Sequence, residues 1–179
     1  HRIYLEQKIP TNATFIDEGN RVNYGYNFLK EVNEKDKIKV LGVGSNTLIR
    51  DGGFNGIILK FGKAFSHTSL LGENMIIAGS SVMDKSLSNF ALENSLSGFE
   101  FLSCIPGTIG GGIKMNAGCF GNEFKDVLLS VQSIDKVGNI ITIPSKDINF
   151  EYRKNNLSED LIFLSASFKG KKGIASEIN

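Results

Sequence analysis

The chain has 179 residues, of which 41% are hydrophobic and 22% charged, and its formal net charge is +1. This composition is typical of a folded domain, and the balanced charge argues against intrinsic disorder and against a general nucleic-acid binder. No stretch approaches the roughly 18 apolar residues of a membrane span, so we expect a cytoplasmic protein with no membrane partner. The 20 glycines, beside only 3 prolines, indicate tight turns or places where a ligand approaches the backbone.

The predicted elements follow an α+β order. Nothing is assigned over residues 3–15, and a short helix is predicted over 27–32. The predicted strands are Ile38–Leu41, Gly56–Phe61, Asn74–Ala78, Val127–Asp135, Asn139–Ile143 and Leu161–Phe168. The clearest predicted helix spans Ser81–Asn94 with Ser81 as its N-cap, and Gly138–Asn139 is predicted to form a hairpin turn. The polar residues 169–173 are expected to be a linker.

No metal site is expected. The chain has two cysteines, Cys104 and Cys119, and two histidines, His1 and His67, without the paired spacing of a zinc site. Two reduced thiols are the expected state, and a disulfide or redox pair is the alternative. His67 has no visible catalytic partner, and we expect it to be a surface or satisfied histidine.

A first glycine segment, Leu41–Asn46 (LGVGSN), directly follows a predicted strand. Glycines allow successive backbone N–H groups to turn toward one point, which makes a nest for a phosphate. The segment has neither the third glycine of the dinucleotide fingerprint nor the Gly-Lys-Ser/Thr of a Walker A loop. A plain turn therefore remains the alternative.

A second glycine segment, Ile105–Gly112 (IPGTIGGG), is followed by Met115–Gly118 (MNAG). So many positions without side chains predict a ligand loop, where a flat ring or a pyrophosphate approaches the main chain. Tight packing of a helix on a sheet is the alternative for some of these glycines. Met115 itself is interpreted as an ordinary core filler.

The pair Tyr152–Arg153 is a third candidate. An arginine guanidinium binds carboxylates and phosphates through two parallel hydrogen bonds. The alternative is the edge of a strand with its polar side chains in solvent.

Together these segments resemble the UDP-N-acetylenolpyruvoylglucosamine reductases, also called UDP-N-acetylmuramate dehydrogenases, the flavoenzymes of the second step of peptidoglycan precursor synthesis. The resemblance covers roughly residues 38–168. The matching stretches are Leu41–Asp51, Gly98–Gly121, Glu123–Val127 and Phe150–Arg153.

The resemblance implies a two-lobed FAD-binding fold of the vanillyl-alcohol-oxidase (PCMH) type, with the C-terminal substrate domain missing. Its subdomains would be residues 1–62 and 63–168, with 169–179 as a linker or the start of the absent domain. The implied FAD-binding residues are Gly42, Val43, Gly44, Ser45, Asn46, Thr47, Leu48, Ile105, Pro106, Gly107, Thr108, Gly110, Gly111, Asn116 and Ala117. Tyr152 would help to hold a UDP-sugar substrate, and Arg153 would support its reacting enolpyruvyl group. NADPH would donate the hydride, and a monomer is favoured.

The chain also departs from the family pattern. The serine and the C-terminal glutamate that serve the family as acids have no counterpart here, so no proton donor is assigned and the chain alone is expected to bind FAD without completing the reduction. Cys104 stands where the family commonly has glycine, and Gly112 where it has alanine. Two other functions remain open: a different FAD-dependent oxidoreductase of the same fold, and a non-catalytic flavin-binding remnant.

Overall fold

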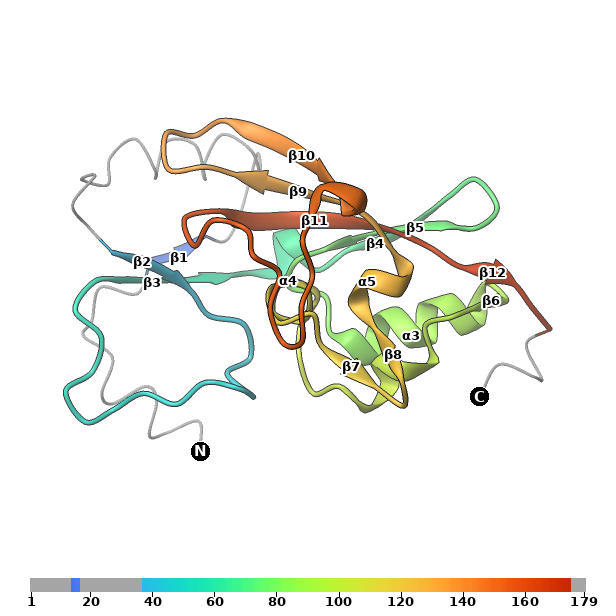
Figure 1. Cartoon of the computed structure of the whole chain (residues 1–179), viewed down its shortest axis with the longest axis horizontal. Coiled ribbons are helices and arrows are strands. Elements are labelled where there is room, and N and C mark those ends of the chain that lie inside the picture. The colour runs from blue at the N-terminus through green and yellow to red at the C-terminus, as the bar shows by residue number, and fades with distance from the viewer. Residues whose placement is uncertain (1–13, 17–36, 175–179) are drawn as a thin grey trace.

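The computed structural model of the chain describes residues 14–16 and 37–174 (Figure 1). The helix predicted over 27–32 lies outside the described residues. Within the described ranges, no helix is long and apolar enough to span a membrane. The mixture of sheets and short helices confirms the predicted α+β class.

The largest element is a five-stranded antiparallel sheet with the strand order β10-β9-β11-β5-β4. Four of its strands run close to the predicted ranges, and β4 was not predicted; of these four, β5, β9 and β11 contain buried side chains. The bounds of the five strands are β4 Thr68–Leu71, β5 Met75–Gly79, β9 Leu128–Ile134, β10 Ile140–Pro144 and β11 Ile162–Lys169.

The connection between β9 and β10 is a hairpin, as predicted. Gly138 has a φ of +91°, a conformation that glycine adopts without strain. The Asp135 carboxylate accepts hydrogen bonds from the backbone N–H groups of Val137 and Asn139 at 3.0 and 2.8 Å. Because these bonds join residues close together in the chain, the turn could be predicted from the sequence.

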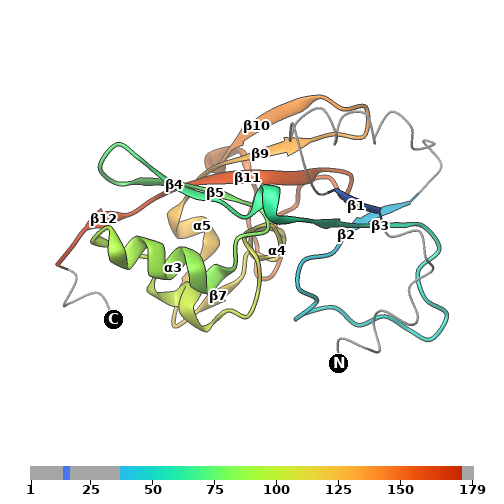
Figure 2. The ribbon, with the colours of Figure 1, turned by 180° about the vertical axis from the view of Figure 1, so that it is seen from behind.

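Three helices lie on one face of this sheet: α3 (Asp84–Glu93), α4 (Ile109–Lys114) and the single turn α5 (Phe124–Val127) (Figures 1 and 2). Leu87 of α3, Ile113 of α4 and Phe124 of α5 are almost completely buried in the main hydrophobic core. The core therefore fills the space between the sheet and these helices.

The predicted N-cap of α3 is wrong. The helix begins at Asp84, its N-cap residue is Met83, and the Ser81 hydroxyl donates instead to the carbonyl of Gly62 at 3.3 Å. The Asp84 N–H donates to the Gly107 carbonyl at 3.1 Å. A distant loop thus satisfies an amide that a capping side chain would otherwise bind.

A second, parallel sheet of three strands has the order β1-β3-β2, with β1 at Thr14–Ile16, β2 at Ile38–Val40 and β3 at Ile57–Phe61. Leu59 of β3 packs with Ile134 of β9 and Ile162 of β11 in a small buried cluster. This cluster joins the two sheets side by side (Figure 2).

The remaining elements are short. Lys169 ends β11, and β12 pairs with β6, so part of the stretch expected to be a linker is paired with the rest of the domain. Their bounds are β6 Leu96–Ser97, β7 Gly118–Cys119, β8 Asn122–Glu123, β12 Lys171–Lys172 and the 3₁₀ turns η1 Lys63–Phe65, η2 Glu100–Cys104 and η3 Ser145–Asp147.

Candidate functional site

The first glycine loop leaves β2 at Leu41, whose N–H still donates to the Leu59 carbonyl of β3 at 2.8 Å. Gly44 then takes a φ of +79°, and the Thr47 N–H donates back to its carbonyl at 3.3 Å. The N–H groups of residues 42–46 donate to no described residue. A turn held in this way keeps several backbone donors available for an anion.

The second glycine loop leads from η2 into α4 and uses its glycines in two ways. A Cβ on Gly112 would overlap the ring of Phe124, so this glycine serves the packing of α4. Gly111 is exposed, and a Cβ there would have only the Thr108 hydroxyl within 4 Å, at 3.7 Å. Helix packing and an open, ligand-accessible backbone therefore both occur within this one segment.

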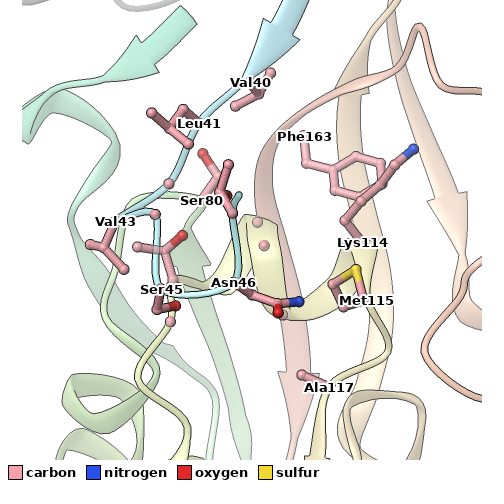
Figure 3. Close-up of a pocket in the computed structure, with 18 of the residues that line it drawn as sticks. Val40, Leu41, Val43, Ser45, Asn46, Ser80, Lys114, Met115, Ala117 and Phe163 are labelled. Atoms are coloured by element: carbon pink, nitrogen blue, oxygen red, sulfur yellow. The ribbon is translucent and has the colours of Figure 1, made fainter. Parts of the chain in front are cut away.

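The two glycine loops are in direct contact. A Cβ on Gly42 would lie 2.7 Å from the Thr108 hydroxyl oxygen. Between the loops and β11 lies a cavity of about 840 Å³, within the usual range of ligand pockets. Figure 3 shows Val43, Ser45 and Asn46 on one side of it and Lys114, Met115 and Phe163 on the other.

The charged residues of the cavity favour an anionic ligand. Five basic and three acidic side chains line it: Lys39, Lys60, Lys114, Lys136 and Arg153, with Asp84, Glu159 and Asp160.

Two of these lysines meet one carboxylate. Lys39 Nζ lies 2.6 Å and Lys114 Nζ 3.6 Å from the carboxylate of Glu159. The hydrogen bond from Lys39 and the charge of Lys114 lower the pKa of Glu159, so this carboxylate is ionised at neutral pH. Lys114 Nζ also lies 5.9 Å from the centre of the Phe163 ring, which holds the amine near the cavity wall.

These features fit a dinucleotide with a diphosphate, such as FAD. The cavity offers unbonded backbone amides, an excess of basic side chains and an apolar wall that includes Phe163. The hydroxyl of Ser80, a residue only 5% exposed, has no partner among the described residues and points toward the first loop (Figure 3). Buried polar groups are nearly always hydrogen-bonded, so this hydroxyl is available to a bound ligand.

Comparison with known proteins decides the family. A family model described as "FAD binding domain" matches residues 27–144. The chain belongs to the FAD-binding domain family. A carbon monoxide dehydrogenase from Hydrogenophaga pseudoflava, with a TM-score of 0.58 at 13% identity over 91% of this chain and 61% of that chain, shares the fold. The predicted two-lobed FAD-binding fold is confirmed.

The relatives of this FAD-binding domain confirm the resemblance drawn from its motifs. Over 84% of the chain it is 62% identical to the UDP-N-acetylenolpyruvoylglucosamine reductase of Pelagibacter ubique and 46% identical to that of Rickettsia canadensis, covering 50% and 51% of those proteins. It also superposes on the crystal structure of the reductase from Thermus caldophilus with a TM-score of 0.74 and 30% identity, over 81% of this chain and 53% of that chain. The chain thus spans about half the length of the relatives that it matches.

Most of the predicted FAD-binding residues line this cavity. Two do not: Leu48, whose side chain is 94% exposed, and Asn116, which is completely buried. The Asn116 amide donates to the Glu123 carboxylate at 3.0 Å and to the Glu151 carbonyl at 3.2 Å, and its oxygen accepts from the Lys125 N–H at 3.2 Å. Asn116 therefore ties together the turns behind the cavity.

The predicted pair Tyr152–Arg153 lies in the tight turn between Glu151 and Lys154, whose backbones pair at 2.9 and 3.3 Å. Arg153 has a φ of +56° and lines the cavity. Tyr152 is 82% exposed and is not among the lining residues, although its ring lies 5.4 Å from the Arg153 guanidinium. Of the pair, only Arg153 therefore lines the cavity, and Tyr152 lies beside it in solvent.

Sequence reasoning missed one wall of the cavity. Ser80, Ser81 and Asp84 line it from the segment between β5 and α3, and Met115, interpreted as a core filler, lines it as well. A Gly-Ser-Ser run directly after a predicted strand was the available signal for this wall.

The expectation of two reduced thiols is wrong. Cys104 and Cys119 form a disulfide, with their Cα atoms 6.9 Å apart, and both line the cavity. The bond joins the end of η2 to β7 and so encloses the whole second glycine loop. The fold brings the two sulfurs together across this loop, and the spacing of the cysteines along the chain does not show that they meet.

Proposed function

We propose that this chain is the FAD-binding part of a UDP-N-acetylenolpyruvoylglucosamine reductase, a cytoplasmic enzyme of peptidoglycan precursor synthesis. The substrate would be the enolpyruvyl ether of UDP-N-acetylglucosamine and the hydride donor NADPH. One observation carries the proposal: the two glycine loops, about 60 residues apart in sequence, line a single cavity together with Arg153. The similarity to reductases from several bacteria supports the same assignment.

FAD would supply hydride transfer from the nicotinamide to the enolpyruvyl double bond. The residues of this chain would bind and orient the cofactor. The unbonded amides of residues 42–46 would donate to the diphosphate, and Lys39 and Lys114 would balance its charge. The apolar wall at Phe163 would exclude water from one side of the ring system.

Arg153 has a separate role at the cavity wall. Its guanidinium would pair with the carboxylate of the enolpyruvyl group and stabilise the negative charge that develops as hydride arrives. One such donor is worth about 3 kcal/mol in known enzymes. Tyr152, exposed beside Arg153, would contact the UDP-sugar at the mouth of the site.

The test is a titration of the purified chain with FAD, followed by quenching of flavin fluorescence. We expect saturable binding of FAD and much weaker binding of riboflavin, because riboflavin lacks the diphosphate. Arg153→Met should bind FAD like the parent chain yet lose the change in flavin absorbance that the enolpyruvyl substrate produces. Arg50→Met is the matched control, since Arg50 is exposed and does not line the cavity. Failure to bind FAD would refute the proposal.

A further inference from the structure

The segment between β5 and α3 forms the backing of the second glycine loop. The Gly110 N–H donates to the Ser80 carbonyl at 2.9 Å, and the Ile109 N–H donates to the Val82 carbonyl at 2.9 Å. The Asp84 N–H donates to the Gly107 carbonyl at 3.1 Å. Asp84 is therefore in direct backbone contact with the second glycine loop.

The carboxyl group of Asp84 is buried behind that loop without a partner. The residue is 0% exposed, and neither carboxyl oxygen has a hydrogen-bond partner among the described residues. A Cβ on Gly107 would lie 2.6 Å from Oδ2, so the loop backbone rests against the carboxyl. Buried polar atoms are nearly always bonded, and an ionised carboxylate in such a place is costly.

No neighbouring charge compensates this carboxyl. The other ionisable side chains on the elements around it are Lys85 and Glu93 on α3, Glu100 on η2, Lys60 on β3 and Lys114 on α4, and none bonds to it. The other charged residues that line the cavity are Lys39, Lys136, Arg153, Glu159 and Asp160. Burial alone raises the pKa of Asp84 to about 7.

We propose that Asp84 is a positioning residue of the flavin site: its neutral carboxyl lets the second glycine loop close, and its ionisation loosens the loop and weakens FAD binding. This inference rests on the proposed FAD binding. A neutral carboxyl can stay against Gly107, whereas a carboxylate needs water or N–H donors and so displaces the backbone that covers it. The negative charge also repels a bound diphosphate.

The experiment measures the FAD dissociation constant of the full chain between pH 6 and 9 by flavin fluorescence. In the parent chain we expect a constant value below pH 7 and a rise approaching tenfold per pH unit above it, as for loss of one required proton. Asp84→Asn should bind with no such pH dependence. Asp147→Asn is the control, because Asp147 is exposed on η3 and does not line the cavity; it should keep the parent profile.

A second readout needs no flavin. Hydrogen exchange of the backbone amides of residues 107–112 in the FAD-free chain should accelerate above pH 7, beyond the intrinsic pH effect, in the parent chain but not in Asp84→Asn. A flat binding profile, a profile shared by Asp84→Asn, or tighter binding at high pH would overturn the inference. If no variant binds FAD while the exchange still depends on Asp84, the proposed function fails and the loop mechanism stands.

Discussion

Replacing Gly42 by alanine tests whether the two glycine loops must touch. The added Cβ would lie 2.7 Å from the Thr108 hydroxyl oxygen, 0.7 Å closer than the 3.4 Å at which ordinary van der Waals contact begins. Gly42 does not have a positive φ, so alanine is compatible with its backbone, and Thr108 is the nearest described residue to the added Cβ. Thr108 is buried and β-branched, which limits its freedom to rotate away.

The expected size of the effect follows from this overlap. Forcing one extra carbon into a packed site costs about 1–3 kcal/mol. If the strain falls on the closed arrangement that binds FAD, the dissociation constant rises about 5- to 150-fold, since about 1.4 kcal/mol corresponds to a factor of ten. The affinity should therefore fall even though Gly42 contributes no side chain.

The assay is the flavin-fluorescence titration, with Gly52→Ala as the matched control. A Cβ on Gly52 would meet nothing within 4 Å, and FAD binding should stay unchanged. Thr108→Ala combined with Gly42→Ala removes the clashing hydroxyl and should restore part of the affinity, which a double-mutant cycle quantifies. The reasoning is refuted if Gly42→Ala binds FAD as tightly as Gly52→Ala, or if the double variant shows no coupling.

Three further predictions concern stability. Iodoacetamide should label neither Cys104 nor Cys119 before reduction, and the double serine variant should lose about 3 kcal/mol of unfolding free energy, the value for a loop of about 15 residues. Asn116→Ala should lower the unfolding free energy by about 1–3 kcal/mol, because it leaves buried groups unpaired. The raised pKa of Asp84, about 7 against 3.8, means that the folded state holds its proton longer, so its contribution to stability falls between about pH 4 and 7, by about 4 kcal/mol in all.

Denaturant unfolding measures each of these changes in stability, and thiol labelling checks the disulfide separately. Labelling of both thiols without reductant would contradict the disulfide. Asn139→Ala, at an exposed hairpin turn, is the comparison for Asn116→Ala, and equal losses would remove the special role of Asn116. Asp84→Asn should show a smaller decline in stability from pH 4 to 7 than the parent chain, and parallel curves would disprove the raised pKa.

The local elements of the fold could be predicted because their causes are local. Runs of β-branched residues predicted β3, β9 and β11, and Asp135 with Gly138 defined a hairpin through contacts within a few residues. The start of α3 could not be predicted, because the amide of Asp84 is satisfied by Gly107, more than 20 residues away. Capping signals in sequence describe only neighbours along the chain.

The two glycine segments by themselves indicated where a ligand could approach the backbone, and the order of the motifs indicated the family. Only the tertiary structure decided that Gly42 lies against Thr108, that Asn116 is buried behind the site and that Leu48 projects into solvent. It also brought Asp84 behind Gly107, where burial raises its pKa, and joined Cys104 to Cys119. The physical reason is the same in each case: these properties arise from contacts between distant segments, and residue type and spacing report only the conformation of the chain near each residue.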